Sequence, residues 1–128
     1  MRRFSAHYIA LPISNIHKLH YIELDDQMQF KSINPLTNEI ADTSFYNGAL
    51  LVVNTTAFSS YKELSTICEC FLEQFPEATL SEFMDHLRLD EIIDSASVAV
   101  YHLDRIDLLS TKFRANDSRS NSHIQRLC

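Results

Sequence analysis

The first half of the chain carries the two-residue alternation of apolar and polar side chains that is typical of β-strands. Residues 4–11 alternate in this way and predict a first strand. Two further apolar runs, 18–24 and 28–33, are separated by Asp25-Asp26-Gln27, whose Asp side chains favour a tight turn. We expect these two runs to form a hairpin, with Pro35 ending its second strand or placing that end on a sheet edge.

A fourth strand is predicted at Phe45–Val53, the most strand-like segment of the sequence. The pair Asn47-Gly48 lies inside it, and this pair favours a hairpin turn because both residues accept a positive φ. Only two residues of the strand precede the pair, so we expect a bulge or a bend here. Four strands in about fifty residues predict a small antiparallel sheet.

The period then changes to that of a helix. Apolar side chains recur along one helical stripe at Leu64, Ile67, Cys68, Phe71 and Phe75. Ser59 or Ser60 is expected to cap this helix, and Pro76 to end it.

A second helix is predicted directly afterwards. Thr79 and Glu82 have the spacing of a capping box, in which each side chain bonds the backbone N–H of the other residue. The apolar stripe comprises Leu80, Phe83, Met84 and Leu87, and Ile92 and Ile93 are expected to extend it.

The last third of the chain returns to strands. Segments 97–103 and 106–109 are read as strands, 116–122 as a polar loop, and 123–127 as a short closing strand. The predicted fold is therefore mainly β with a helical insert (α+β), a small antiparallel β-sandwich plus two helices. We expect one domain, 1–128, with a β-rich part (1–53), a helical insert (59–94) and closing strands with a tail (97–128).

Composition narrows the class of protein. A chain of 128 residues is in the usual range for one domain. Its formal net charge of −6 disfavours a nucleic-acid partner, because the positive side chains that would neutralise phosphates cluster only in the tail. That cluster consists of Lys112, Arg114, Arg119 and Arg126. No segment has the roughly 20 apolar residues of a membrane helix, so no membrane partner is expected.

The expected location is the cytoplasm. The basic start of the chain leads into an alternating segment and not into the apolar block of a signal peptide. The three cysteines, Cys68, Cys70 and Cys128, have no disulfide-framework spacing and are expected to be reduced. Cys68 is predicted to be a core residue and Cys70 to point to the side, since residues two apart on a helix diverge.

Six histidines suggest a metal site, but their spacing does not match a known motif. His17 and His20, three apart on a strand, are expected on opposite faces. His7, His20 and His102 lie in mid-strand, where a partly buried side chain with a backbone or carboxylate partner is the ordinary interpretation. The alternative is a new ligand or metal pocket in which these three converge with Glu23 or Asp104.

Other catalytic motifs are missing from the sequence. It contains no HExxH, CxxC or GxSxG motif, and a single glycine cannot build a phosphate-binding loop. The carboxylate pairs Asp25-Asp26 and Asp90-Glu91 are read as a turn and a solvated helix face. We therefore expect no enzymatic activity and no cofactor.

Two stretches, 3–9 and 45–53, together resemble the N-terminal segment of metal-dependent amidohydrolases, especially Bacteroidetes-type sequences. In that family this segment belongs to a composite β-sandwich beside a TIM barrel. Residues 103–108 and 124–127 are similar to the C-terminal strands of the same sandwich. Residues 75–77 and the predicted helix from Thr79 resemble more loosely the last helices after the barrel. About 75 residues are covered in all.

The resemblance implies a framework that lacks its barrel. In the family, the segment that matches 45–53 is followed directly by a metal-binding His-x-His motif. In this chain, Asn54-Thr55-Thr56 follows instead. A complete barrel needs roughly 200 residues or more, so it cannot fit, and no catalytic or metal residue of the family carries over. The resemblance implies a non-catalytic interaction or scaffolding domain whose partner is a second copy, another protein or a full-length amidohydrolase.

Overall fold

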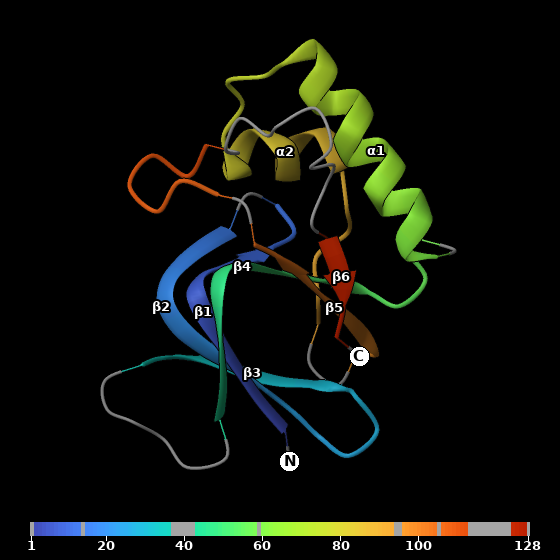
Figure 1. Cartoon of the computed structure of the whole chain (residues 1–128). Helices are drawn as coiled ribbons and strands as arrows, with labels where there is room; N and C mark the ends of the chain where they lie inside the picture. Colours follow the sequence, from blue (N-terminus) through green and yellow to red (C-terminus); the bar gives the residue numbers. More distant parts are fainter. Residues whose placement is uncertain are drawn as a thin grey trace.

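The computed structural model describes residues 2–13, 15–36, 43–58, 60–93, 96–104, 106–112 and 124–127. Within these residues it contains strands and two helices, with both helices at one end of the sheet (Figure 1). In chain order, the elements are β1 (Arg2–Leu11), β2 (Asn15–Leu24), β3 (Phe30–Pro35), β4 (Thr43–Asn54), α1 (Tyr61–Gln74), α2 (Leu80–Leu87), β5 (Val98–Leu103) and β6 (Ile124–Arg126).

The strands form one open, mixed sheet in the order β3-β2-β1-β4-β5-β6. β1 and β4 are parallel, and every other neighbouring pair is antiparallel. The mainly β, α+β fold with two helices is confirmed, whereas the antiparallel sandwich of two sheets is wrong. The sheet is not purely antiparallel because the chain returns after β3 to the end of the sheet where β1 starts. β4 therefore runs beside β1 in the same direction.

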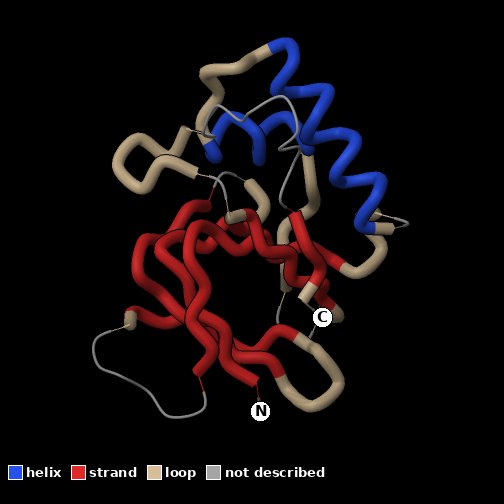
Figure 2. The backbone as a smooth tube through the Cα atoms, in the orientation of Figure 1, coloured by secondary structure: helices blue, strands red, loops and turns tan. Residues whose placement is uncertain are grey.

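A strong curl of the single sheet takes the place of a second sheet (Figure 2). An isolated bridge joins Gln29, just before β3, to Ser97, just before β5. Beside it, the Phe30 N–H donates to the Ala96 carbonyl at 2.8 Å, and the Val98 N–H donates to the Met28 carbonyl at 3.1 Å. The sheet thereby encloses one of its faces within its own curve, and the helices cover part of the other face.

Two hydrophobic cores result, one on each face. The core inside the curl, here called the inner core, includes Phe4, Ile9, Ile22, Leu24, Leu50, Val52 and Val100. The core under the helices, the helix-side core, includes Tyr8, Leu51, Val53, Leu64, Phe71, Phe83 and Tyr101. The apolar run 49–53 follows from this arrangement, because alternate residues of a central strand face opposite cores.

Local signals in the sequence act as expected. The Asp25 carboxylate accepts the backbone N–H groups of Gln27 and Gln29, both at 2.9 Å, and so forms the hairpin turn. Ser60 caps α1, and the capping box of α2 is complete between Thr79 and Glu82.

The predicted extension of the second helix to Ile92 and Ile93 is wrong. Helix α2 ends at Leu87 because Arg88 adopts a left-handed conformation with φ 51°. The chain then crosses to the other face, where Ile92 packs against the inner core while Ile93 stays exposed.

Segment 106–109 forms a turn and not a strand. The Asp107 carboxylate accepts the backbone N–H groups of Leu109 and Ser110, which bends the chain locally. Leu109 is 95% exposed as a consequence.

In the described residues, no helix is long and apolar enough to cross a membrane. The short closing strand is confirmed as β6. The predicted loop 116–122 and Cys128 lie outside the described residues.

Candidate functional site

The bulge expected at Asn47-Gly48 is present and bends β4 beside β1. The register between the two strands shifts by one residue between the pairs Ala6–Tyr46 and Tyr8–Ala49. Gly48 has φ 97°, and a Cβ placed there would lie 2.4 Å from the carbonyl oxygen of Leu103 in β5. Only glycine fits this position without displacing the neighbouring backbone.

Two of the predicted candidate histidines bind the backbone of this bulge. The Gly48 N–H donates to Nδ1 of His7 at 3.2 Å, and Nε2 of His102 donates to the carbonyl of Asn47 at 2.6 Å. A bulge leaves ladder groups unpaired, and these imidazoles supply partners for them. Because Nδ1 of His7 accepts a hydrogen bond, its ring is neutral in this arrangement and carries its proton on Nε2.

A cavity of about 400 Å³ lies beside the bulge. Its lining combines polar and apolar residues: His7, Asn47, Gly48, Asp104, Ile106 and Leu108. The Tyr8 hydroxyl donates to the carbonyl of Leu108, which ties the turn after β5 to β1. The structure thus brings His7 and Asp104 to one cavity, where an imidazole N–H and a carboxylate can both hydrogen-bond a small polar ligand.

The remaining predicted candidates lie elsewhere. His20 pairs with Ala6 on the β2 side of β1, and its Nδ1 donates to the carbonyl of Lys18 at 2.9 Å. Glu23 forms an ion pair with Arg3 at 2.8 Å. Across the described ranges, no group of three or more His, Cys, Asp or Glu side chains could hold a metal ion. The three histidines His7, His20 and His102 therefore do not converge.

The prediction that His17 and His20 lie on opposite faces is wrong. Their ring centroids are 4.9 Å apart. Leu19 between them has φ 55°, which breaks the alternation of the strand at that point. Burial, together with the nearby His20, lowers the pKa of His17. The sequence does not reveal this pair, because a regular strand would place the two histidines on opposite faces. Leucine at position 19 gives no indication that the backbone there adopts a left-handed conformation.

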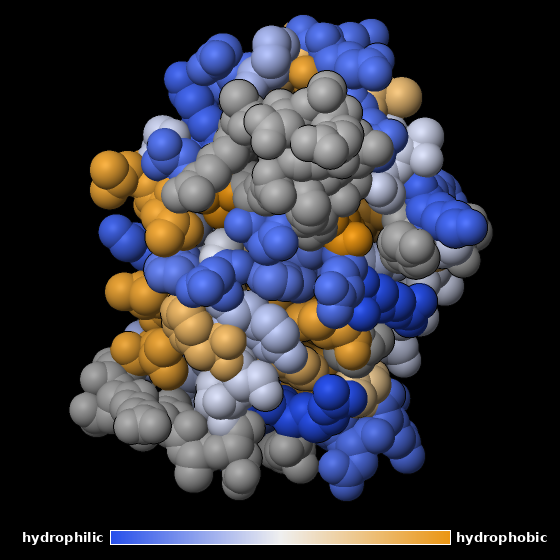
Figure 3. Space-filling model, in the orientation of Figure 1, coloured by the Kyte–Doolittle hydropathy of each residue, from blue (hydrophilic) through white to orange (hydrophobic). Residues whose placement is uncertain are grey.

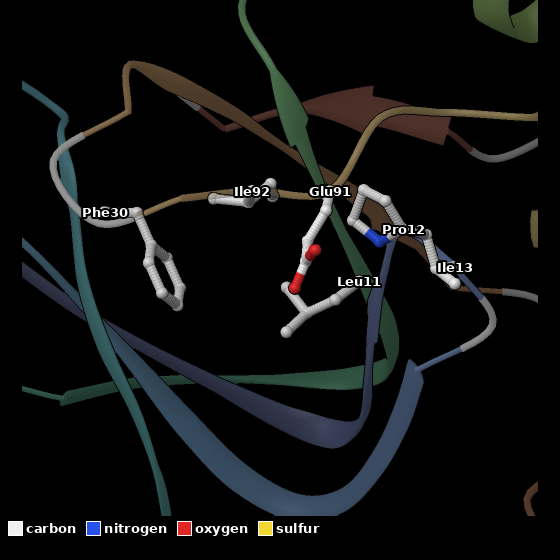
Figure 4. A pocket seen from close by; sticks show the side chains of 6 residues that line it. All are labelled: Leu11, Pro12, Ile13, Phe30, Glu91 and Ile92. Atoms are coloured by element: carbon white, nitrogen blue, oxygen red, sulfur yellow. The ribbon is translucent and has the colours of Figure 1, made fainter.

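A second cavity, of about 200 Å³, opens at the mouth of the curled sheet (Figure 4). Leu11 and Phe30 form its floor, and Ile92 and Glu91 from the segment after α2 reach over it (Figure 4). Among the described residues that line it, Glu91 alone carries a charge. These described residues offer apolar contact and a single carboxylate, whereas acid–base chemistry uses a pair of groups.

Neither described cysteine belongs to these cavities. Cys68 is buried in the helix-side core, where burial raises the pKa of its thiol to about 12, and Cys70 is exposed. Both orientations agree with the helical stripe expected from the sequence.

Comparisons of the chain with models of protein families, with curated proteins and with solved structures find no match. The resemblance to amidohydrolases therefore rests only on the short sequence segments described above.

Proposed function

We propose that this protein is a non-catalytic interaction domain that pairs with a second copy of itself through one uncovered face of its sheet. This open face consists of Arg3, Ser5 and His7 of β1, Tyr21 and Glu23 of β2, and Thr43 and Phe45 of β4. The strand register supports the grouping, because Tyr21, Ser5 and Phe45 lie in one row across three strands. Residues paired in this way share a face of the sheet.

The observation that carries the proposal is an exposed aromatic side chain on a sheet face that no helix of the described chain covers. Phe45 is 49% exposed, although its strand partner Ser5 is completely buried. Both helices lie at the other end of the sheet, away from the start of β1 and β4 (Figure 1). A half-exposed aromatic on an ordered strand is typical of interface residues.

Charge favours a second copy as the occupant. The protein has a formal net charge of −6, so two copies repel each other over most orientations. On the open face, Arg3 and Glu23 neutralise each other in a 2.8 Å ion pair, and the other members have no formal charge when His7 is neutral. Two open faces can therefore meet without bringing like charges together, which suits the self-complementary contact of a twofold dimer.

Apolar surface also gathers at the left of the space-filling view, over the turn after β5 and beside β2 (Figure 3). Leu19 of β2, which lies between the register pairs Ala6–His20 and Tyr8–Lys18, is 44% exposed. Exposed apolar side chains that gather on one side of a protein are common at protein interfaces.

The oligomeric state in solution tests the proposal. Size-exclusion chromatography with light scattering is expected to give a dimer for the unmodified chain and a monomer for Phe45→Glu. Phe75→Glu is the matched control, because Phe75 is the same residue type with a similar exposure of 53% but follows α1 at the opposite end. A monomeric unmodified chain at high micromolar concentration, or loss of the dimer in both variants, would contradict the proposal.

A second candidate function is the binding of a small polar ligand in the cavity beside the bulge. Its volume of about 400 Å³ is in the range of ligand sites, and His7 and Asp104 both line it. A thermal-shift screen of small polar compounds tests this candidate. A compound that stabilises the unmodified chain but not His7→Gln or Asp104→Asn supports it, and a screen without any such compound counts against it.

A further inference from the structure

The pair His17 and His20 has four features that together indicate a site beyond the proposed self-association. Their rings are neighbours, with centroids 4.9 Å apart. They are brought together by Leu19, an apolar residue in a left-handed conformation that such side chains rarely adopt. Backbone strain of this kind persists only where the surroundings impose it, and it concentrates at functional sites.

The hydrogen bond of His20 fixes which of its nitrogens can bind a ligand. Nδ1 of His20 donates to the carbonyl of Lys18 at 2.9 Å, so in the neutral ring Nε2 carries the lone pair. Metal-binding histidines in proteins usually anchor their other ring nitrogen in this way, on a backbone carbonyl or a carboxylate.

His17 has an unsatisfied nitrogen next to this ring. Its Nε2 is buried and has no hydrogen-bond partner among the described residues. Buried polar atoms without a partner are rare in folded proteins, because leaving one unsatisfied costs free energy that a bound ion or an ordered water recovers. The neighbours of the pair on β1 are the apolar Ile9 and Ala6, which offer no side-chain partner.

We propose that His17 and His20 form a two-histidine site for a divalent transition-metal ion. Imidazole nitrogens bind such ions at about 2.0–2.1 Å, so the two donor atoms must come within roughly 3–4 Å of each other. Rings with centroids 4.9 Å apart are near enough for this, because His17 can turn about its soft χ2 torsion while the Lys18 carbonyl holds the His20 ring. Water completes the coordination, and Cu²⁺ binds more tightly than Ni²⁺ or Zn²⁺.

The first test locates the ion directly in the full chain, prepared without a histidine tag. Substoichiometric Cu²⁺ is added, and the ring proton signals of all histidines are followed by NMR. Selective broadening of the His17 and His20 signals is the expected result. Broadening that spares both of these rings overturns the proposal, and this test needs no variant to fold.

The second test measures affinity by calorimetric titration with Cu²⁺. His17→Gln and His20→Gln each turn a chelating pair into a single ligand, and binding is expected to weaken on the order of 10²-fold. His102→Gln is the matched control and is expected to bind as the unmodified chain does, because His102 lies on β5. Unchanged affinity in both His17→Gln and His20→Gln overturns the proposal.

The backbone at Leu19 gives a third readout that leaves both ligands in place. Leu19→Gly keeps the left-handed conformation and is expected to retain Cu²⁺ binding, whereas Leu19→Ile disfavours it and is expected to weaken binding about tenfold. Equal binding by the two variants shows that the Leu19 conformation does not position the rings and contradicts this part of the proposal. Because Phe45→Glu leaves the pair untouched, loss of the dimer and loss of the metal site can be told apart.

Discussion

Replacement of Gly48 by alanine is expected to destabilise the fold more than its size suggests. Gly48 has φ 97°, and holding a residue with a Cβ in so sparsely populated a region costs about 1–3 kcal/mol. The new Cβ would also lie 2.4 Å from the carbonyl oxygen of Leu103, so β4 and β5 must separate locally. Weakening one ladder hydrogen bond adds about 1 kcal/mol, which gives a total of about 2–4 kcal/mol.

This loss is large compared with the total stability of a domain, which is about 5–15 kcal/mol. Urea unfolding followed by circular dichroism measures it, and the midpoint of thermal unfolding is expected to fall on the order of 10 °C. Asn47→Ala is the matched control, because Asn47 has no positive φ and offers its backbone carbonyl to His102. It should cost less than about 1 kcal/mol. A Gly48→Ala variant as stable as Asn47→Ala would refute the reasoning.

Three further outcomes test other parts of the structure. Iodoacetamide applied to the folded protein near neutral pH should modify the exposed Cys70 and spare Cys68, because burial raises the pKa of the Cys68 thiol to about 12. Peptide mapping that finds equal modification of the two cysteines would contradict the buried position of Cys68. Backbone hydrogen bonds, foremost that from Gln29, lower the pKa of Asp25 below its unfolded value of 3.8, so its stabilising effect is complete above about pH 4 and is lost as the pH falls through the folded value. Urea unfolding over an acidic pH series should therefore show a steeper loss for the unmodified chain than for Asp25→Asn, which keeps an acceptor oxygen but no charge, and equal slopes would exclude this role. Thr79→Ala removes the capping box of α2 and should cost about 1 kcal/mol by urea unfolding, and an unchanged free energy of unfolding would show that the cap is not needed.

Part of the candidate site is predictable from the sequence. Asn47-Gly48 indicates a bulge, and His7, His102 and Asp104 are candidates by residue type. Their actual roles depend on strands that are distant in the chain: His7 reaches the bulge across β1–β4, and His102 reaches it across β4–β5. No spacing along the sequence reveals such pairings, so the sequence does not show that His20 lies on β2, opposite Ala6.

The wrong predictions share a cause. Ile92 and Ile93 continue an apolar pattern, and 106–109 resembles a strand, but Arg88 and the Asp107 turn reverse the chain in both places. The positive φ of Arg88, like that of Leu19, is imposed by packing and not by a preference of the residue itself.

Features that act over a few residues could be predicted from the sequence: the hairpin at Asp25, the caps at Ser60 and Thr79, and the strand over 45–53. These depend on hydrogen bonds and periodicity within one or two turns of chain. Three features could be seen only in the folded chain: β1 and β4 are parallel, one curled sheet replaces a sandwich, and His17 lies beside His20. Such outcomes depend on contacts between distant segments, whose energies no local pattern contains.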